Sequence, residues 1–164
     1  HTPDKKHKIY CFEDRLGSSG RFYSVYLQYV KNGKVTWNQI ADWRAGKYSN
    51  QRIDKIYTFL HNGQTYYVLI SYCYNVAYFE IVTIENGNFI THSEFYPKQF
   101  QNNIKDGVIE FYGGSDSYFD LEFDSQTLTI NYTFYSYMGE VEEHGQKSPQ
   151  YKKTEQKTVK LDIE

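Results

Sequence analysis

Acidic side chains recur with even spacing between residues 116 and 124. They are Asp116, Asp120, Glu122 and Asp124. Carboxylates that alternate along a strand point to one face, and oxygen ligands of this kind can bind Ca²⁺. The spacing of a calcium-binding loop is absent, however, and a row of like charges also keeps a sheet face hydrated. The stretch therefore predicts a solvated strand face and no metal site.

A second possible chemistry is hydrolysis by paired carboxylates, which must face each other across a cleft at about 5–10 Å. Glu80, Glu94, Glu110 and Asp120 can supply such a pair, although many acidic chains offer similar candidates. His92 lies in a strand-like sequence, where a structural histidine is commoner than a catalytic base. These residues define no catalytic site, so the sequence favours a protein that is not an enzyme and uses no cofactor.

Aromatic residues are the most distinctive feature of the composition. The chain of 164 residues contains 18 Tyr, 11 Phe and 2 Trp. Exposed aromatic rings stack on sugar rings and anchor protein interfaces. A tyrosine can also lie half-buried on a strand with only its hydroxyl in water, and that alternative accounts for most of the tyrosines.

The two tryptophans, Trp37 and Trp43, are six residues apart on one expected strand. In a strand without a bulge both rings point to the same face, with Cα atoms about 20 Å apart. With Tyr26 or Phe22 nearby, they predict a ligand-binding platform at Trp37, Trp43 and Tyr26. The alternative is that this face packs on a second sheet and that the rings belong to the core.

The elements that carry these residues are indicated by three Asn-Gly pairs, at 32–33, 62–63 and 86–87. Asn and Gly tolerate the positive φ of a two-residue type I′ turn, so each pair predicts a β-hairpin. The pairs predict the cross-strand partners Phe59–Tyr66, Tyr57–Val68, Ile56–Leu69, Val30–Val35, Gln28–Trp37 and Phe22–Trp43. A further turn at Ser125-Gln126 predicts the partners Phe119–Tyr132, Leu121–Ile130 and Phe123–Leu128.

The stretch from 55 to 90 organises the fold and predicts three consecutive antiparallel strands. Its middle strand, 65–74, is apolar on both faces, which indicates a central strand covered on both sides. The residues expected in the core are Val68, Leu69, Ile70, Phe79, Ile81, Leu121, Phe123 and Ile130.

Taken together, these patterns predict one all-β domain over residues 1–164. About ten strands form an antiparallel meander of stacked sheets, as a sandwich or a barrel, with a small propeller-like arrangement as the alternative. The segment 88–96 reads as a strand, 97–107 as weakly helical and 158–163 as a closing strand. The polar segments 1–7 and 138–156 are expected to be mobile, the second as a loop.

Composition and charge exclude some classes of partner. The formal net charge is −2, so no basic field favours nucleic acid. No apolar run approaches the roughly 18 residues of a membrane helix. The two cysteines, Cys11 and Cys73, allow one disulfide in an oxidising compartment, and the alternative is two buried thiols.

The segments IYCFEDRLGSSGRFYSVYLQYVKNGKV, DKIYTFLHNGQTYYVLISY and FEIVTIENGNF, within residues 8–90, resemble secreted all-β proteins of gut-type bacteria. The resemblance rests on strand patterning, and no function is known for that family, so no catalytic residues carry over. It implies a secreted, periplasmic or cell-surface location, with a lipid anchor upstream of His1 as one form. The missing initiator methionine fits a cleaved signal peptide or a trimmed chain.

Three functions are compatible with the sequence. The favoured one is a non-catalytic binding module outside the cytoplasm, with a glycan or a protein as its ligand. The alternatives are a hydrolase of extracellular polymers and a structural domain of a larger surface protein.

Overall fold

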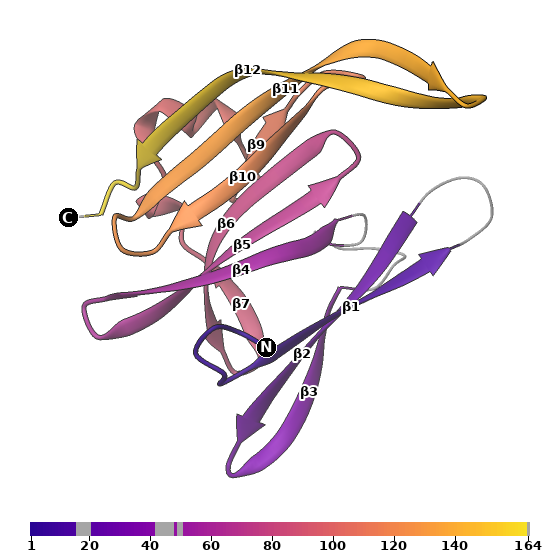
Figure 1. The fold of residues 1–164 in the computed structure, drawn as a ribbon. Helices are drawn as coiled ribbons and strands as arrows, with labels where there is room; N and C mark the ends of the chain where they lie inside the picture. Colours follow the sequence, from indigo (N-terminus) through magenta and orange to yellow (C-terminus); the bar gives the residue numbers. More distant parts are fainter. Residues whose placement is uncertain (16–20, 42–47, 49–50, 164) are drawn as a thin grey trace.

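A computed structural model of the chain describes residues 1–15, 21–41, 48 and 51–163 (Figure 1). Nearly all of the regular structure is antiparallel strand, which confirms the predicted all-β class. The strands are β1 (Lys8–Arg15), β2 (Arg21–Lys31), β3 (Lys34–Ala41), β4 (Arg52–His61), β5 (Gln64–Cys73), β6 (Val76–Glu85), β7 (Asn88–Thr91), β8 (Ile104–Lys105), β9 (Val108–Tyr112), β10 (Tyr118–Asp124), β11 (Thr129–Glu143) and β12 (Gln146–Lys160). Two short 3-10 helices, η1 (Ser93–Phe95) and η2 (Lys98–Asn103), complete the described elements.

All three predicted Asn-Gly turns are present, with both residues in the left-handed region. At the turn between β4 and β5, for example, Asn62 has φ 48° and Gly63 has φ 76°. The turns set the predicted registers between β4 and β5 and at the β2–β3 turn. The confirmed pairs are Phe59–Tyr66, Tyr57–Val68, Ile56–Leu69, Val30–Val35 and Gln28–Trp37.

The strands form three sheets that stack as layers (Figure 1). The central sheet has the order β4-β5-β6-β9-β8, and β7 pairs with the remaining length of the β6 edge. One outer sheet is β1-β2-β3 and the other is β10-β11-β12. The predicted stacking of antiparallel sheets is therefore observed as a sandwich of three layers.

Strand β5 lies in the middle layer and is buried on both faces, as its two-sided apolar sequence predicts. Val68 and Ile70 pack in the core shared with the β10–β12 sheet, next to Leu121. Leu69 faces the opposite way, in a smaller cluster that includes Ile9 of β1. All eight residues predicted for the core are buried.

The stretch 55–90 contains one more strand than predicted. A turn at Tyr74 and Asn75 separates β5 from β6, and Tyr74 has φ 52°. An exposed tyrosine in the left-handed region gives no sequence signal of a turn, since asparagine and glycine are the usual residues there. The strand expected over 88–96 also ends early, at Thr91, and η1 follows.

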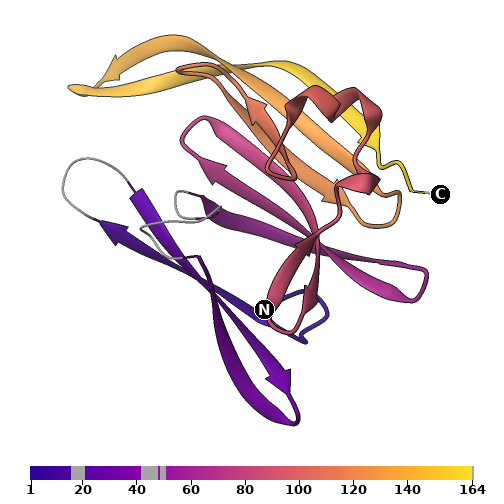
Figure 2. The same ribbon diagram turned by 180° about the vertical axis from the view of Figure 1, so that it is seen from behind.

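After Thr91 the chain leaves the sheet, and Tyr96 enters the core. Its hydroxyl donates to the carbonyl of Gly107 at 2.7 Å and accepts from the backbone N–H of Ile81 at 3.3 Å. Helix η2 follows where the sequence reads as weakly helical, and Figure 2 shows the two helices from behind.

The hairpin between β10 and β11 has a longer turn than predicted. Residues 125–128 form the turn, Leu128 has φ 55°, and Phe123 pairs with Ile130 instead of Leu128. Asp124 stabilises this turn by accepting from the backbone N–H of Gln126 at 2.8 Å. The register differs from the predicted one by two residues, so the predicted pairs are wrong but the predicted faces are right.

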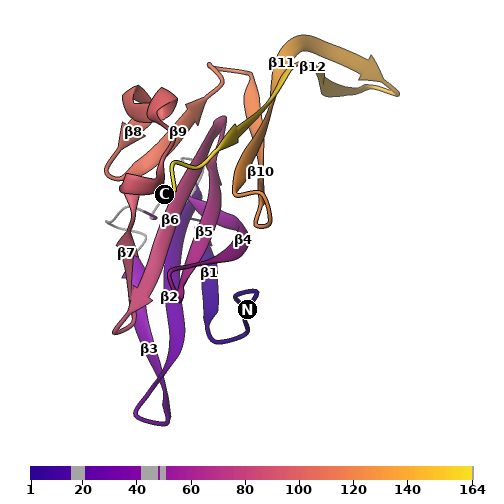
Figure 3. The ribbon, with the colours of Figure 1, turned by 90° about the vertical axis from the view of Figure 1, so that its left-hand side faces the viewer.

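The prediction of a loop over 138–156 is wrong, because these residues belong to β11, to β12 and to the turn of the β11–β12 hairpin. Its turn lies at His144 and Gly145, with φ 53° and 77°. Figure 3 shows that the far end of this hairpin extends away from the rest of the molecule, and we call residues 138–151 the arm. Side chains on both faces of the arm are exposed, and neither face is apolar. The alternation of apolar and polar residues that usually indicates a strand is therefore absent from its sequence.

The N-terminal residues 1–7 form a turn against the central sheet. Asp4 accepts a hydrogen bond from the Tyr67 hydroxyl at 2.8 Å, and Thr2 is buried. The mobility expected of this segment stays a prediction.

Candidate ligand-binding face

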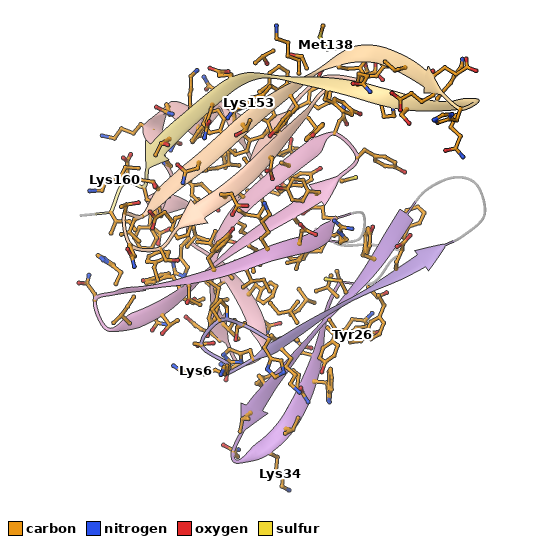
Figure 4. The ribbon with its side chains drawn as sticks, in the orientation of Figure 1. Lys6, Tyr26, Lys34, Met138, Lys153 and Lys160 are labelled. Carbon is orange, nitrogen blue, oxygen red and sulfur yellow. The ribbon has the colours of Figure 1, made fainter. Side chains whose placement is uncertain are left out.

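Four aromatic side chains lie on the face of the β1–β3 sheet that is turned away from the central sheet. They are Tyr10 and Phe12 of β1, Tyr26 of β2 and Trp37 of β3. The register places Tyr10 opposite Tyr26, and Gln28 lies between Lys8 and Trp37 in the next row. Cross-strand partners share a face, so the four rings gather on one surface, which we call the aromatic face (Figure 4, in which Tyr26 is labelled).

The rings of the aromatic face touch one another in a chain. The centroids of Trp37 and Tyr10 are 5.0 Å apart, those of Tyr10 and Phe12 are 6.3 Å apart, and those of Phe12 and Tyr26 are 5.8 Å apart. Phe12 and Trp37 are nevertheless 54% and 50% exposed. Mutual contact holds the rings in place while their outer surfaces remain open to solvent.

The opposite face of the same sheet explains this exposure. Val25 and Leu27 of β2 point toward the central sheet and are fully buried. Ile9 of β1 is partly buried and packs against the apolar clusters between the two sheets. The strands alternate, so the residues between these positions must point outward. The expected alternative, in which Trp37 belongs to the core, does not hold.

Two of the three residues predicted for the ligand-binding platform, Trp37 and Tyr26, lie on the aromatic face. The third, Trp43, lies outside the described residues, and so does its expected pairing with Phe22. The register of β2 and β3 shifts between Val25 and Tyr26, so β3 is not the unbulged strand that the expected spacing of the two tryptophans requires.

Tyr10 and Phe12 were not among the residues predicted for the ligand-binding platform. The sequence of β1 does indicate that these two rings share one face of a strand. Tyr10 and Phe12 alternate with Ile9 and Cys11, so the two faces of the strand are both apolar but differ in kind. The sequence between β1 and β2, LGSSG at 16–20, is not a two-residue turn motif that fixes a register, so the pairing that brings these rings to Tyr26 was not predictable from local signals.

Polar and basic groups border the aromatic face. A hollow of about 210 Å³ at one end is lined by Lys5, Lys6, His7, Lys8, Gln28, Tyr29, Val30 and Val35. Burial lowers the pKa of His7, and Lys6 adds to this effect while Asp4 opposes it. Hydrogen-bonding groups beside stacked rings suit a ligand that is apolar on its ring faces and polar at its edges.

The acidic row of β10 is not simply a solvated face. The Lys55 ammonium of β4 contacts Asp120 at 3.0 Å and Glu122 at 2.7 Å, and it donates to the carbonyl of Leu121 at 2.8 Å. Burial opposes the charged form of Lys55, but its hydrogen bonds to Glu122 and Asp120 outweigh burial and raise its pKa. The carboxylates of Asp120 and Glu122 thus join the β10–β12 sheet to β4, the edge strand of the central sheet.

The hydroxyls of two tyrosines complete this junction. The Tyr57 hydroxyl donates to Glu122, and the Tyr72 hydroxyl donates to Asp120 at 3.2 Å. Hydrogen bonds from Lys55 and then from Tyr57 lower the pKa of Glu122.

Groups of three or more possible metal ligands are absent from the part of the chain that the structure describes.

The carboxylates considered for hydrolysis lie on four different elements. Glu80 of β6 is only 2% exposed and accepts from the Tyr48 hydroxyl and from Thr91 Oγ1, the latter at 2.6 Å. Glu94 of η1 accepts from His92 Nδ1 at 2.8 Å, and Asp120 of β10 binds Lys55. These contacts assign Glu80, Glu94 and Asp120 to separate structural roles.

The histidine and cysteine candidates also have structural surroundings. The other ring nitrogen of His92 lies 2.9 Å from Thr83 Oγ1, and its ring packs on Tyr66 with the centroids 5.0 Å apart. Cys11 and Cys73 are free, half-buried thiols, and burial raises the pKa of each.

Comparisons of the chain with protein families, with curated proteins and with solved structures found no match. Within the described residues, no helix has the length and apolar character needed to cross a bilayer.

Proposed function

We propose that this chain is a non-catalytic binding module that holds an extended glycan on its aromatic face. The observation that carries the proposal is the exposure of Phe12 and Trp37, at 54% and 50%, within a cluster of four touching rings. Exposed apolar area is unfavourable in water, so a ligand that covers these rings gains about 25 cal/mol for each Å² removed from solvent.

The chemistry of a sugar fits this surface. The C–H face of a pyranose is apolar and its rim carries hydroxyls, so the rings supply stacking while Gln28, Gln39 and Lys8 supply polar partners. The location outside the cytoplasm, which the resemblance to secreted proteins implies, forms part of the proposal because extracellular glycans are found there.

A protein ligand is the second candidate. Val30 and Val35 pair across the β2–β3 hairpin and are each 62% exposed, so the apolar surface continues beyond the aromatic face. A continuous apolar surface with aromatic anchors and a polar border also suits a protein interface.

A glycan array probed with the purified chain tests the proposal, and a pull-down tests the protein alternative. Trp37→Ala should weaken binding to any glycan hit about tenfold or more, since an aromatic anchor contributes more than about 1.4 kcal/mol. Tyr112→Ala is the matched control, because Tyr112 is an exposed aromatic on β9 in the central sheet. Equal losses in the two variants, or binding to no glycan, would refute the glycan proposal.

The remaining alternatives give different outcomes in the same samples. Release of new reducing ends from a bound polymer would indicate the hydrolase. Absence of both glycan and protein ligands would favour a structural domain of a larger surface protein.

A further inference from the structure

A second hollow, of about 390 Å³, lies where the arm leaves the β10–β12 sheet. Three segments that are distant in sequence line it: the turn between β5 and β6, the loop before β10 with the first residue of β10, and the part of the β11–β12 hairpin where the arm begins. The lining residues are Tyr74, Asn75, Ser115, Asp116, Ser117, Tyr118, Tyr137, Glu140, Pro149 and Tyr151. We call this the tyrosine pocket.

Tyrosine rings form the walls of the pocket. The ring centroids of Tyr118 and Tyr151 are 4.9 Å apart with an interplanar angle of 78°, and those of Tyr137 and Tyr151 are 5.9 Å apart at 61°. On its other side Tyr118 stacks on Tyr135 at 4.9 Å. Tyr151 thus contacts Tyr118 and Tyr137 edge to face, and these three rings all line the hollow.

Two hydrogen bonds help to hold the loop side of the pocket. The Ser117 hydroxyl accepts from the backbone N–H of Tyr137 at 3.1 Å, which ties the loop to β11 just before the arm. The Ser115 hydroxyl donates to Asp116 at 3.0 Å. Tyr74, by contrast, is 78% exposed at its turn, so the pocket is open on that side.

The charged side chains that line the tyrosine pocket are both acidic. Asp116 and Glu140 are its ionisable lining residues apart from the tyrosines, and the lining contains no lysine, arginine or histidine. Burial, then Glu140 and Asp116, raise the pKa of Tyr137. π faces and carboxylates both attract cations and both disfavour anions.

We propose that the tyrosine pocket binds an alkylammonium group, as a quaternary ammonium head or as a lysine-type side chain. The cation–π attraction of the rings and the two carboxylates compensate the cation for the water that it loses on entry. This site is separate from the aromatic face, and neither proposal depends on the other.

One residue of the chain itself competes for the same carboxylate. The Lys147 ammonium lies 3.8 Å from Glu140 Oε2, and both side chains are largely exposed. An exposed pair at this distance is worth little, so a ligand cation can replace it. Removal of the lysine charge should therefore increase the affinity of the pocket.

Titration with choline, with n-butylammonium and with dimethylbutanol, the neutral carbon isostere of choline, tests the proposal. Tyrosine side-chain NMR signals report the binding. Choline or n-butylammonium should shift the signals of Tyr118, Tyr137 and Tyr151, and the neutral alcohol should bind about fivefold or more weakly. The better of the two cations identifies the source of the group, methylated or primary.

Variants make the test specific. Asp116→Asn and Glu140→Gln should each weaken cation binding, Lys147→Gln should strengthen it, and Glu142→Gln on the exposed arm is the matched control. Tyr74→Asn removes one aromatic ring from the pocket and should weaken cation binding. Asparagine tolerates the positive φ of this turn, so the variant keeps the fold. Equal affinity for choline and its neutral isostere, or affinities unchanged in Asp116→Asn and Glu140→Gln, would overturn the proposal.

Discussion

At the residue scale, Lys55 shows how a charge pattern acquires a structural role. The acidic row of β10 is visible in the sequence, but its partner lies 65 residues earlier on β4. Long-range pairing of this kind has no local signature. A row of alternating carboxylates therefore predicts that these side chains share one face of a strand. It does not predict which residue of another strand they contact.

Lys55→Gln should lower the free energy of unfolding by about 1 kcal/mol at neutral pH, because the ion pairs are partly exposed and screened by solvent. Chemical denaturation measures this change. Glu143→Gln, at the exposed end of the arm, is the control and should have no effect. An unchanged midpoint in Lys55→Gln would show that the junction of β4 and β10 does not depend on this charge.

The same junction predicts a response to acid. The pKa of Glu122 is lower in the folded chain than its ordinary value, so its contribution is present above the unfolded pKa and is lost as pH falls through the folded pKa. Between about pH 5 and pH 3 the wild type should lose more stability than Glu122→Gln. Parallel pH profiles of the two proteins would contradict this.

At the element scale, the hairpins at Asn32-Gly33 and Asn62-Gly63 were predictable down to individual residue pairs near the turn. The turns at Tyr74 and at residues 125–128 were not, because tyrosine and leucine carry the positive φ there. The register shift of β3 opposite Val25 and Tyr26 was also unpredictable. Local turn chemistry specifies a register only where the turn residues are typical of their conformation.

Gly87 combines a turn requirement with a packing requirement. Its φ is 80°, and a Cβ at this position would overlap the Tyr29 ring of β2. Gly33 has φ 73° in the same kind of turn, with nothing near a Cβ. Gly87→Ala should therefore cost more stability than Gly33→Ala, by about 1 kcal/mol or more, because a steric overlap is added to the same backbone strain. Equal costs in chemical denaturation would show that β2 does not pack on the β6–β7 turn as described.

At the scale of the whole molecule, the central sheet is the common support of both outer sheets. Leu69 belongs to the cluster that faces β1–β3 and is fully buried. Leu69→Ala should lower the free energy of unfolding by about 2–5 kcal/mol, the range for a buried leucine. Leu60→Ala, on the exposed side of β4, is the control and should cost less than about 0.5 kcal/mol. A small effect at Leu69 would contradict the three-layer arrangement.

The many packed tyrosines predict sensitivity to alkali. Burial is the main cause that raises the pKa of Tyr57, Tyr72 and Tyr78 to about 12, and nearby acidic groups add to it: Glu122 at Tyr57, Asp120 at Tyr72, and Cys73 and Glu110 at Tyr78. A raised folded pKa gives stability that is present below the unfolded value and is lost as pH rises through the folded value. Stability should thus fall between about pH 10 and pH 12, with absorbance at the phenolate band and circular dichroism changing together. Phenolate formation well before unfolding would contradict the packing of these rings.

The aromatic face and the tyrosine pocket differ in how much of each could be predicted from the sequence. Trp37 and Tyr26 follow from strand alternation and an Asn-Gly turn, whereas Tyr10 and Phe12 reach the aromatic face through a pairing without a turn motif. The tyrosine pocket collects residues from 74 to 151, and its far wall lies in a segment that read as a loop. Sites assembled from three segments need the tertiary fold before they can be recognised.

The fluorescence of Trp37 tests the central claim, an open aromatic face that binds glycan, most directly. Trp43→Phe leaves Trp37 as the single tryptophan of the chain. In this variant we expect a soluble quencher to reach Trp37 freely, and a saturating oligosaccharide from the array to shift its emission and protect it from the quencher. A Trp37 that is shielded without ligand, or one whose emission and quenching are unchanged at saturation, would contradict the claim.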